Sequence, residues 1–165
     1  MKFKVFISYS THDLKQIELL REQIARTPIE VFIARDSIPP SQELTSRIKS
    51  EIQECDLFIV LWSRNAKDSE WISQEIGQAS AYDKTILPLV LDEELEPPGF
   101  ISGLKCLPIF EDLETALTKA EEIVMMEYDK KLTREKKALM AKEKDRKFLM
   151  GMGLGALFLW AINQK

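Results

Sequence analysis

Short apolar runs alternate with helical hydrophobic patterns along the first two thirds of the chain, and this alternation limits the possible folds more than any other feature. The strand-like runs, rich in β-branched and aromatic residues, occupy residues 3–7, 30–34, 56–62, 85–91 and 105–110. Between these runs the apolar residues recur every three or four positions, as they do in amphipathic helices. Strands that alternate with helices predict an α/β fold built around a parallel sheet.

Five strands of this kind most often adopt the flavodoxin-like order 2-1-3-4-5, with the run at 56–62 (DLFIVLW) as a central, fully covered strand. In that order the chain changes direction between the first and third strands, and ligands bind beside this point at the carboxyl ends of the strands. Three segments follow strands there, namely residues 8–13, 35–42 and 62–65 with the helix after them. We therefore expect a functional site to draw on these segments.

Several occupants of such a fold are excluded by missing residues. A phosphate-binding loop or a GxGxxG dinucleotide motif needs glycines after the first strand, and this chain has none there. A receiver domain needs acidic residues after the first and third strands to hold Mg²⁺, whereas residues 7–9 read ISY and residues 61–63 read LWS. His12 is the only histidine, and Cys55 and Cys106 are isolated and expected to be reduced. We expect no metal site and no bound cofactor.

The charge of the chain is unevenly distributed. The net charge of the 165 residues is −4, which does not suggest a nucleic-acid-binding protein. Residues 1–118 contain 12 basic and 20 acidic side chains, whereas residues 119–165 contain 11 basic and 7 acidic ones. An acidic body followed by a basic tail indicates a partner or a surface for the tail.

Trp71 and Glu75 are four residues apart in the helix expected after residue 69, so both lie on one face of it. That face is displaced from the apolar stripe formed by Ile72, Ile76 and Ala79. The pattern leaves two interpretations open. Glu75 is either a carboxylate beside an aromatic ring in a functional site, or a solvated carboxylate on a helix whose Trp71 packs on the sheet edge.

Four segments resemble boxes of the Toll/interleukin-1 receptor (TIR) domain family. Residues 5–10 (VFISYS) resemble its first box, and residues 33–40 (IARDSIPP) resemble its second strand and the BB loop. Residues 56–63 (DLFIVLWS) match the central strand, and residues 69–75 (SEWISQE) resemble the SxWxxxE segment. The segments occur in the order and spacing of the family, and the resemblance covers residues 1–118.

The resemblance implies a flavodoxin-like three-layer fold and an activity. In those family members that cleave NAD⁺, the glutamate of SxWxxxE is catalytic, and here that residue is Glu75. NAD⁺ is then the substrate rather than a cofactor, and cleavage of its nicotinamide–ribose bond forms an oxocarbenium-like ribosyl centre. The resemblance places the following residues beside the nucleotide: Ser8, Tyr9, Ser10, Asp36, Ser63 and Trp71.

The family also contains members that act as scaffolds and polymerise through the BB loop. This alternative assigns self-association to the loop that holds Pro39 and Pro40, without catalysis. Because Glu75 is present, we expect an NAD⁺ hydrolase that is activated by self-association and serves defence or cell-death signalling. Consumption of NAD⁺ distinguishes the two alternatives.

The chain beyond residue 118 is expected to form one long helix with two parts. Residues 119–147 predict a charged stalk, and residues 148–162 form an uncharged apolar run flanked by Lys147 and Lys165. We expect a cytoplasmic TIR domain that this run anchors in a lipid membrane, with Gly151 and Gly155 permitting close contact between helices. The alternative is an apolar helix that packs against another copy or a partner.

Overall fold

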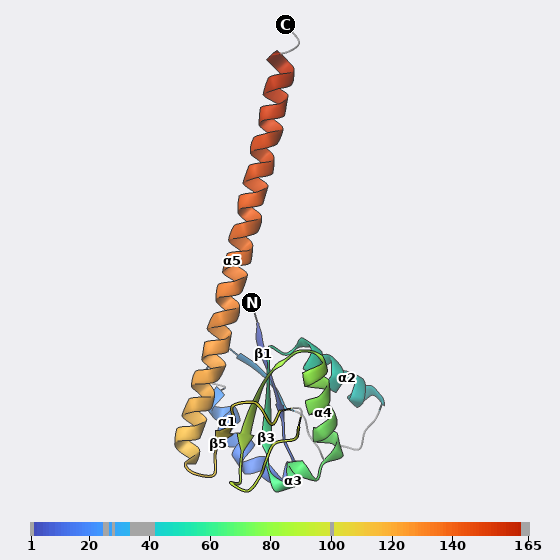
Figure 1. Ribbon diagram of the computed structural model, residues 1–165, viewed down its shortest axis with the longest axis vertical. Helices are drawn as coiled ribbons and strands as arrows, with labels where there is room; N and C mark the ends of the chain where they lie inside the picture. Colours follow the sequence, from blue (N-terminus) through green and yellow to red (C-terminus); the bar gives the residue numbers. More distant parts are fainter. Residues whose placement is uncertain (1, 25–26, 28, 34–41, 100, 163–165) are drawn as a thin grey trace. The chain divides into compact units, whose positions relative to one another are not determined.

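The computed structural model describes residues 2–24, 27, 29–33, 42–99 and 101–162, with the side chains of residues 42–43 and 149–162 excepted. Strands and helices alternate in it as the sequence predicts (Figure 1). The strands are β1 (Phe3–Ser8), β2 (Ile29–Ile33), β3 (Leu57–Trp62), β4 (Thr85–Val90) and β5 (Leu107–Pro108). The helices are the 3₁₀ turn η1 (Thr11–Asp13), α1 (Leu14–Ile24), α2 (Gln42–Glu54), α3 (Arg64–Lys67), α4 (Glu70–Ala81) and α5 (Leu113–Ile162).

The five strands form one parallel sheet in the order β2-β1-β3-β4-β5, which confirms the predicted flavodoxin-like topology. The register pairs Val5 with Leu57 and Ser8 with Val60, so β1 and β3 end side by side. The change of direction along the sheet therefore lies between them, as predicted. Strand β5 has two residues where the sequence predicted six, because only Leu107 and Pro108 pair with β4.

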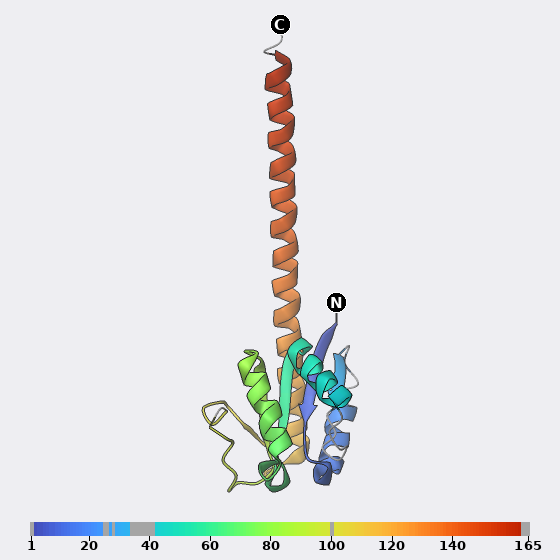
Figure 2. The same ribbon diagram turned by 90° about the vertical axis from the view of Figure 1, so that its right-hand side faces the viewer.

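Helices cover both faces of the sheet. Figures 1 and 2 show α2 and α4 against one face, and α1 with the first turns of α5 against the other. Every residue of β3 is buried, as a central parallel strand requires. On the face below α2 and α4, the ring of Phe6 stacks between those of Phe32 and Phe58 at centroid distances of 5.4 and 5.3 Å.

Helix α5 begins in the domain and continues for 50 residues. The structure divides the chain into two compact units, Met1–Met125 and Met126–Lys165. In the first unit, α5 contributes the buried residues Ala116, Ala120 and Val124 to the core. In the second, the side chains of residues 133–148 are all exposed. The predicted divisions at residues 118 and 147 stay predictions.

The prediction of a C-terminal membrane anchor is wrong. Within the part of the chain that the structure describes, no helix is both long enough and apolar enough to span a bilayer. The physical reason is the length of the run, since 15 residues at 1.5 Å each reach about 22 Å, whereas the hydrocarbon core is about 30 Å thick. The helix continues through Gly151 and Gly155, and their predicted role in self-association is not tested.

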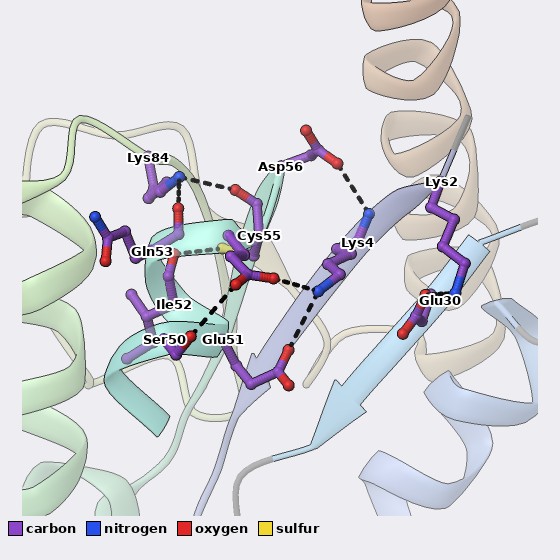
Figure 3. A network of polar contacts seen from close by, with 11 residues as sticks. Lys2, Lys4, Glu30, Ser50, Glu51, Ile52, Gln53, Cys55, Asp56 and Lys84 are labelled. Carbon is purple, nitrogen blue, oxygen red and sulfur yellow. Dashed lines mark hydrogen bonds and ion pairs between the residues drawn. The ribbon is translucent and has the colours of Figure 1, made fainter. Parts of the chain in front are cut away.

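The amino ends of the strands carry a network of charged side chains (Figure 3). Lys4 Nζ lies 2.6 Å from a carboxylate oxygen of Glu54 and 3.7 Å from one of Glu51, and both glutamates are on α2. The hydrogen bond from Lys4 holds the pKa of Glu54 below its usual value. Lys84 Nζ donates to the carbonyl oxygens of Gln53 (2.6 Å) and Cys55 (3.0 Å). These contacts fix the C-terminal end of α2 on the sheet.

Candidate functional site

At the opposite edge of the sheet, a buried hydroxyl and a buried carboxylate meet. Ser8 is the last residue of β1, and its Oγ donates a hydrogen bond to Glu75 Oε2 on α4 at 2.5 Å. The exposed fraction is 0% for Ser8 and 1% for Glu75. Charged residues are rarely buried this deeply, since removing an ionised carboxylate from water costs free energy that neighbouring groups must offset.

The local sequence of α4 explains how Glu75 reaches this position. Ser69 caps the helix, because its side chain accepts a hydrogen bond from the backbone N–H of Ile72. The buried residues of the helix are Ile72, Glu75, Ile76 and Ala79, so Glu75 lies within the stripe that packs on the sheet. The interpretation of Glu75 as a solvated carboxylate is therefore wrong. Trp71 is partly buried and packs against the same core.

A cavity of about 110 Å³ lies beside Glu75, between α2 and α4. Its lining consists of residues three or four positions apart on each helix, which is the spacing that places side chains on one helical face. Polar side chains dominate this lining, and an amide, an ammonium group and a carboxylate all reach it. The lining residues are Thr45, Ile48 and Lys49 from α2, and Trp71, Gln74, Glu75 and Gln78 from α4.

A second polar cluster joins the ends of β1 and β3. The buried Asp13 accepts hydrogen bonds from the hydroxyl of Ser63 and from Asn65 Nδ2, the latter at 2.9 Å. Ser63 Oγ also accepts from the backbone N–H of Ala66 at 2.9 Å and so caps the short helix α3. The predicted segments 8–13 and 62–65 thus meet, as expected. Their contacts join the two loops.

The structure places the predicted site residues in different surroundings. The structure brings Ser8, Trp71 and Glu75 to one place, with Ser8 bound to the carboxylate. Ser10 accepts from the backbone N–H of His12 at the start of η1, and Ser63 joins the second cluster. Tyr9 is buried at the end of β1. The predicted residues Asp36, Pro39 and Pro40 lie outside the described residues. Whether any of these residues binds substrate stays a prediction.

Four residues at this edge were not singled out in the sequence. Asp13 and Asn65 hold the second cluster together, and Lys49 and Gln78 line the cavity. Gln78 could have been found, because it lies three residues after Glu75 on the same helical face. The contribution of Lys49 depends on how α2 packs against α4, which the sequence pattern does not reveal.

The order of the strands and the site at their carboxyl edge define a flavodoxin-like α/β domain. The TIR domain family model matches residues 5–124, so the chain belongs to the TIR domain family. This confirms the resemblance seen in the sequence. The match contains β2 to β5, all of β1 except its first two residues, the Ser8–Glu75 pair and the cavity.

Three similar proteins are informative. A protein of Brachypodium distachyon named as a probable 2' cyclic ADP-D-ribose synthase is 29% identical over 137 residues, which cover 78% of this chain. The match spans 60% of the length of that protein. The structure of the CMP N-glycosidase BcmB of Clostridium botulinum is 27% identical with a TM-score of 0.56, covering 72% of this chain and 98% of BcmB. The TIR domain of the Toll-related receptor TRR-2 of Hydra magnipapillata is 22% identical with a TM-score of 0.52 and covers 69% and 97% of the two chains.

Proposed function

We propose that this TIR domain cleaves the N-glycosidic bond of a nucleotide, with NAD⁺ as substrate and Glu75 as the catalytic carboxylate. The observation that carries the proposal is the burial of Glu75 at the carboxyl edge of the sheet, beside a cavity and held by Ser8. Burial of a carboxylate costs free energy, so a carboxylate that is nevertheless buried indicates a structural or functional use. Its position beside the change of strand direction favours function.

The proposed reaction needs few groups. As the bond between the ribose C1′ and the nicotinamide nitrogen breaks, its electron pair moves to that nitrogen and neutralises the cationic ring. Positive charge develops on the ribose, and the Glu75 carboxylate stabilises it electrostatically. A water molecule then adds to C1′ and releases one proton, so hydrolysis yields nicotinamide, ADP-ribose and H⁺. Because the leaving nicotinamide is neutral, the site needs no general acid, and the single carboxylate suffices.

The similar proteins support this reaction class at a coarse level. The names of the Brachypodium and Clostridium proteins refer to a cyclic ADP-ribose and to N-glycoside cleavage of CMP. Both names concern ribonucleotides. NAD⁺ is the favoured substrate because the SxWxxxE segment of the NAD⁺-cleaving TIR domains is matched at residues 69–75. Because BcmB is named as a CMP N-glycosidase, CMP is the second candidate substrate.

A scaffold without catalysis is the alternative function, with self-association through the loop that holds Pro39 and Pro40. We propose that self-association instead raises the activity, since it increases the local concentration of neighbouring domains. A steep rise of specific activity with protein concentration supports this role. A specific activity independent of concentration argues against it.

The test is to incubate the purified full chain, at high concentration, with NAD⁺ and CMP together and to quantify the free bases by mass spectrometry. We expect release of nicotinamide and no release of cytosine, and Glu75→Ala abolishes the release. Glu70→Gln is the matched control, because Glu70 is an exposed glutamate at the start of the same helix. Release of cytosine alone would transfer the proposal to CMP. If concentrated wild-type protein releases neither base, the proposed catalysis is wrong and the scaffold function is favoured.

A further inference from the structure

A buried amide oxygen atom beside Glu75 accepts no hydrogen bond. Among the described residues, Gln78 Oε1 is shielded from solvent and accepts no hydrogen bond. Buried polar atoms in native proteins are nearly always paired, and an unpaired one costs about 1–3 kcal/mol. A donor that arrives with a ligand would pair this oxygen atom and remove the cost.

The position of Gln78 indicates which part of a ligand it meets. Gln78 lines the same cavity as Glu75 and follows it by three residues on α4. Residues with this spacing have Cβ atoms about 5–6 Å apart on a helix. This separation is comparable with the distance from the anomeric carbon of a nucleotide to the exocyclic group across its base. If Glu75 faces the ribose, the amide of Gln78 can face the outer edge of the base.

The other walls of the cavity suit a flat heterocycle. Trp71 and Ile48 contribute apolar surface, and ligand sites commonly combine such surface with a few oriented polar groups. Nicotinamide carries a carboxamide and cytosine carries an exocyclic amino group, and both present N–H donors. A glutamine Oε1 is an acceptor, and the terminal torsion of the side chain is broad, so the amide can turn to meet such a donor.

We propose that Gln78 is a specificity-determining residue whose Oε1 accepts a hydrogen bond from the exocyclic N–H of the base that is released. This inference rests on the proposed function and names the feature of the substrate that the site reads. A base that lacks the N–H leaves the buried oxygen unpaired and is rejected. Sites built to hydrogen-bond a substrate group discriminate strongly against analogues that lack that group.

The test compares NAD⁺ with its 3-acetylpyridine analogue, in which a methyl group replaces the amide nitrogen. We expect kcat/KM of the wild-type protein to favour NAD⁺ by about tenfold after correction for the intrinsic reactivity of the two bonds. Gln78→Met keeps the length of the side chain and removes the acceptor, so the preference disappears through a loss with NAD⁺ alone. Gln74→Met is the matched control. Gln74 also lines the cavity but is exposed, so we expect the preference to be retained.

An equal loss with both substrates in Gln78→Met would overturn the inference, because it would indicate a role in packing only. Binding of NAD⁺ and the analogue to the Glu75→Gln protein, measured by calorimetry, separates the inference from the proposed function. If Gln78 sets the binding preference and no variant cleaves either dinucleotide, the proposed catalysis fails, whereas recognition of the exocyclic N–H by Gln78 stands. If the wild-type protein cleaves NAD⁺ and its preference is independent of Gln78, the inference alone fails.

Discussion

Charged residues are used in opposite ways at the amino edge of the sheet, where the parallel strands begin, and at the carboxyl edge, where they end. At the amino edge, Lys4 pairs with Glu51 and Glu54 in contact with solvent (Figure 3). At the carboxyl edge, Glu75 is buried and accepts a hydrogen bond from the neutral hydroxyl of Ser8. Strand β1 connects the two places, since Lys4 lies near its start and Ser8 at its end.

We infer from this difference that the amino edge serves stability and that the carboxyl edge serves the proposed chemistry. Exposed ion pairs contribute little free energy because water screens them, and they are tolerant of change. A buried carboxylate held by a hydroxyl is costly, and its charge acts strongly on a substrate because water is excluded. We therefore expect substitutions at the carboxyl edge to change activity and those at the amino edge to leave activity unchanged.

Among substitutions that leave Glu75 in place, the largest expected effect is the loss of turnover in Ser8→Ala. Loss of the hydroxyl removes a hydrogen bond that orients Glu75, and hydrogen bonds to charged groups contribute about 1.5–3 kcal/mol. We expect kcat to fall about 10- to 100-fold with KM within about twofold of the wild type. Steady-state kinetics measure both constants. The control is Ser73→Ala, because Ser73 is an exposed serine of α4, the helix that carries Glu75. A raised KM with unchanged kcat would instead favour the predicted contact between Ser8 and substrate.

The next effect concerns the amino edge at alkaline pH. Burial raises the pKa of the Cys55 thiol from an ordinary 9.0 to about 11. Above pH 9 the unfolded chain loses this proton while the folded chain keeps it, so the folded state loses stability as pH rises from 9 to 11. We expect Cys55 to account for a loss of about 2–3 kcal/mol at pH 11. Urea unfolding at several pH values checks this, and Cys55→Ala should show a shallower decline. Parallel declines in the two proteins would contradict the effect.

A smaller change in stability is expected for Lys84→Met. The ammonium group of Lys84 binds two carbonyl oxygens at the C-terminal end of α2, where a positive charge is favourable. Its removal should lower the free energy of unfolding by about 1 kcal/mol and leave kcat unchanged. Chemical denaturation combined with a turnover assay measures both. A loss of turnover in protein that is fully folded would mean that the amino edge also serves catalysis.

The smallest effect is expected for Lys4→Met. The side chains of Lys4 and Glu51 are partly exposed and that of Glu54 is exposed, so water screens both ion pairs. The hydrogen bond with Glu54 raises the pKa of Lys4, which is protonated at neutral pH in any case. Melting temperatures of variant and wild type should agree within the error of differential scanning fluorimetry. A clear drop in the melting temperature would show that the network at the amino edge acts cooperatively.

Periodicity was sufficient to predict the sheet, because strand runs such as residues 56–62 are apolar and bounded by polar turns. It missed α3, since four residues capped by Ser63 are too few to show a helical period. The burial of Glu75 could not be derived from its spacing, because it depends on how α4 docks on the sheet. The resemblance to TIR domains nominated Glu75 as a site residue but did not predict its burial. The prediction of a membrane anchor was wrong because the apolar character of residues 148–162 was given more weight than their short length.

The pairing of Ser8 with Glu75 shows a further limit of sequence reasoning. Both residues were predicted to belong to the site, and 67 positions separate them in the chain. Residue type and family motif predicted two separate contacts with the nucleotide. Only the fold shows that the serine hydroxyl is already engaged by the carboxylate.

The central claim is that the buried carboxylate of Glu75, and no carboxylate at the amino edge, performs the reaction. The most direct measurement is the rate of nicotinamide release from NAD⁺ by wild type, Glu75→Gln and Glu51→Gln at equal, high protein concentration. We expect Glu75→Gln to lose at least about 100-fold in kcat, in the range found for the loss of one electrostatic stabiliser, and Glu51→Gln to match the wild type. Equal rates in wild type and Glu75→Gln would contradict the account.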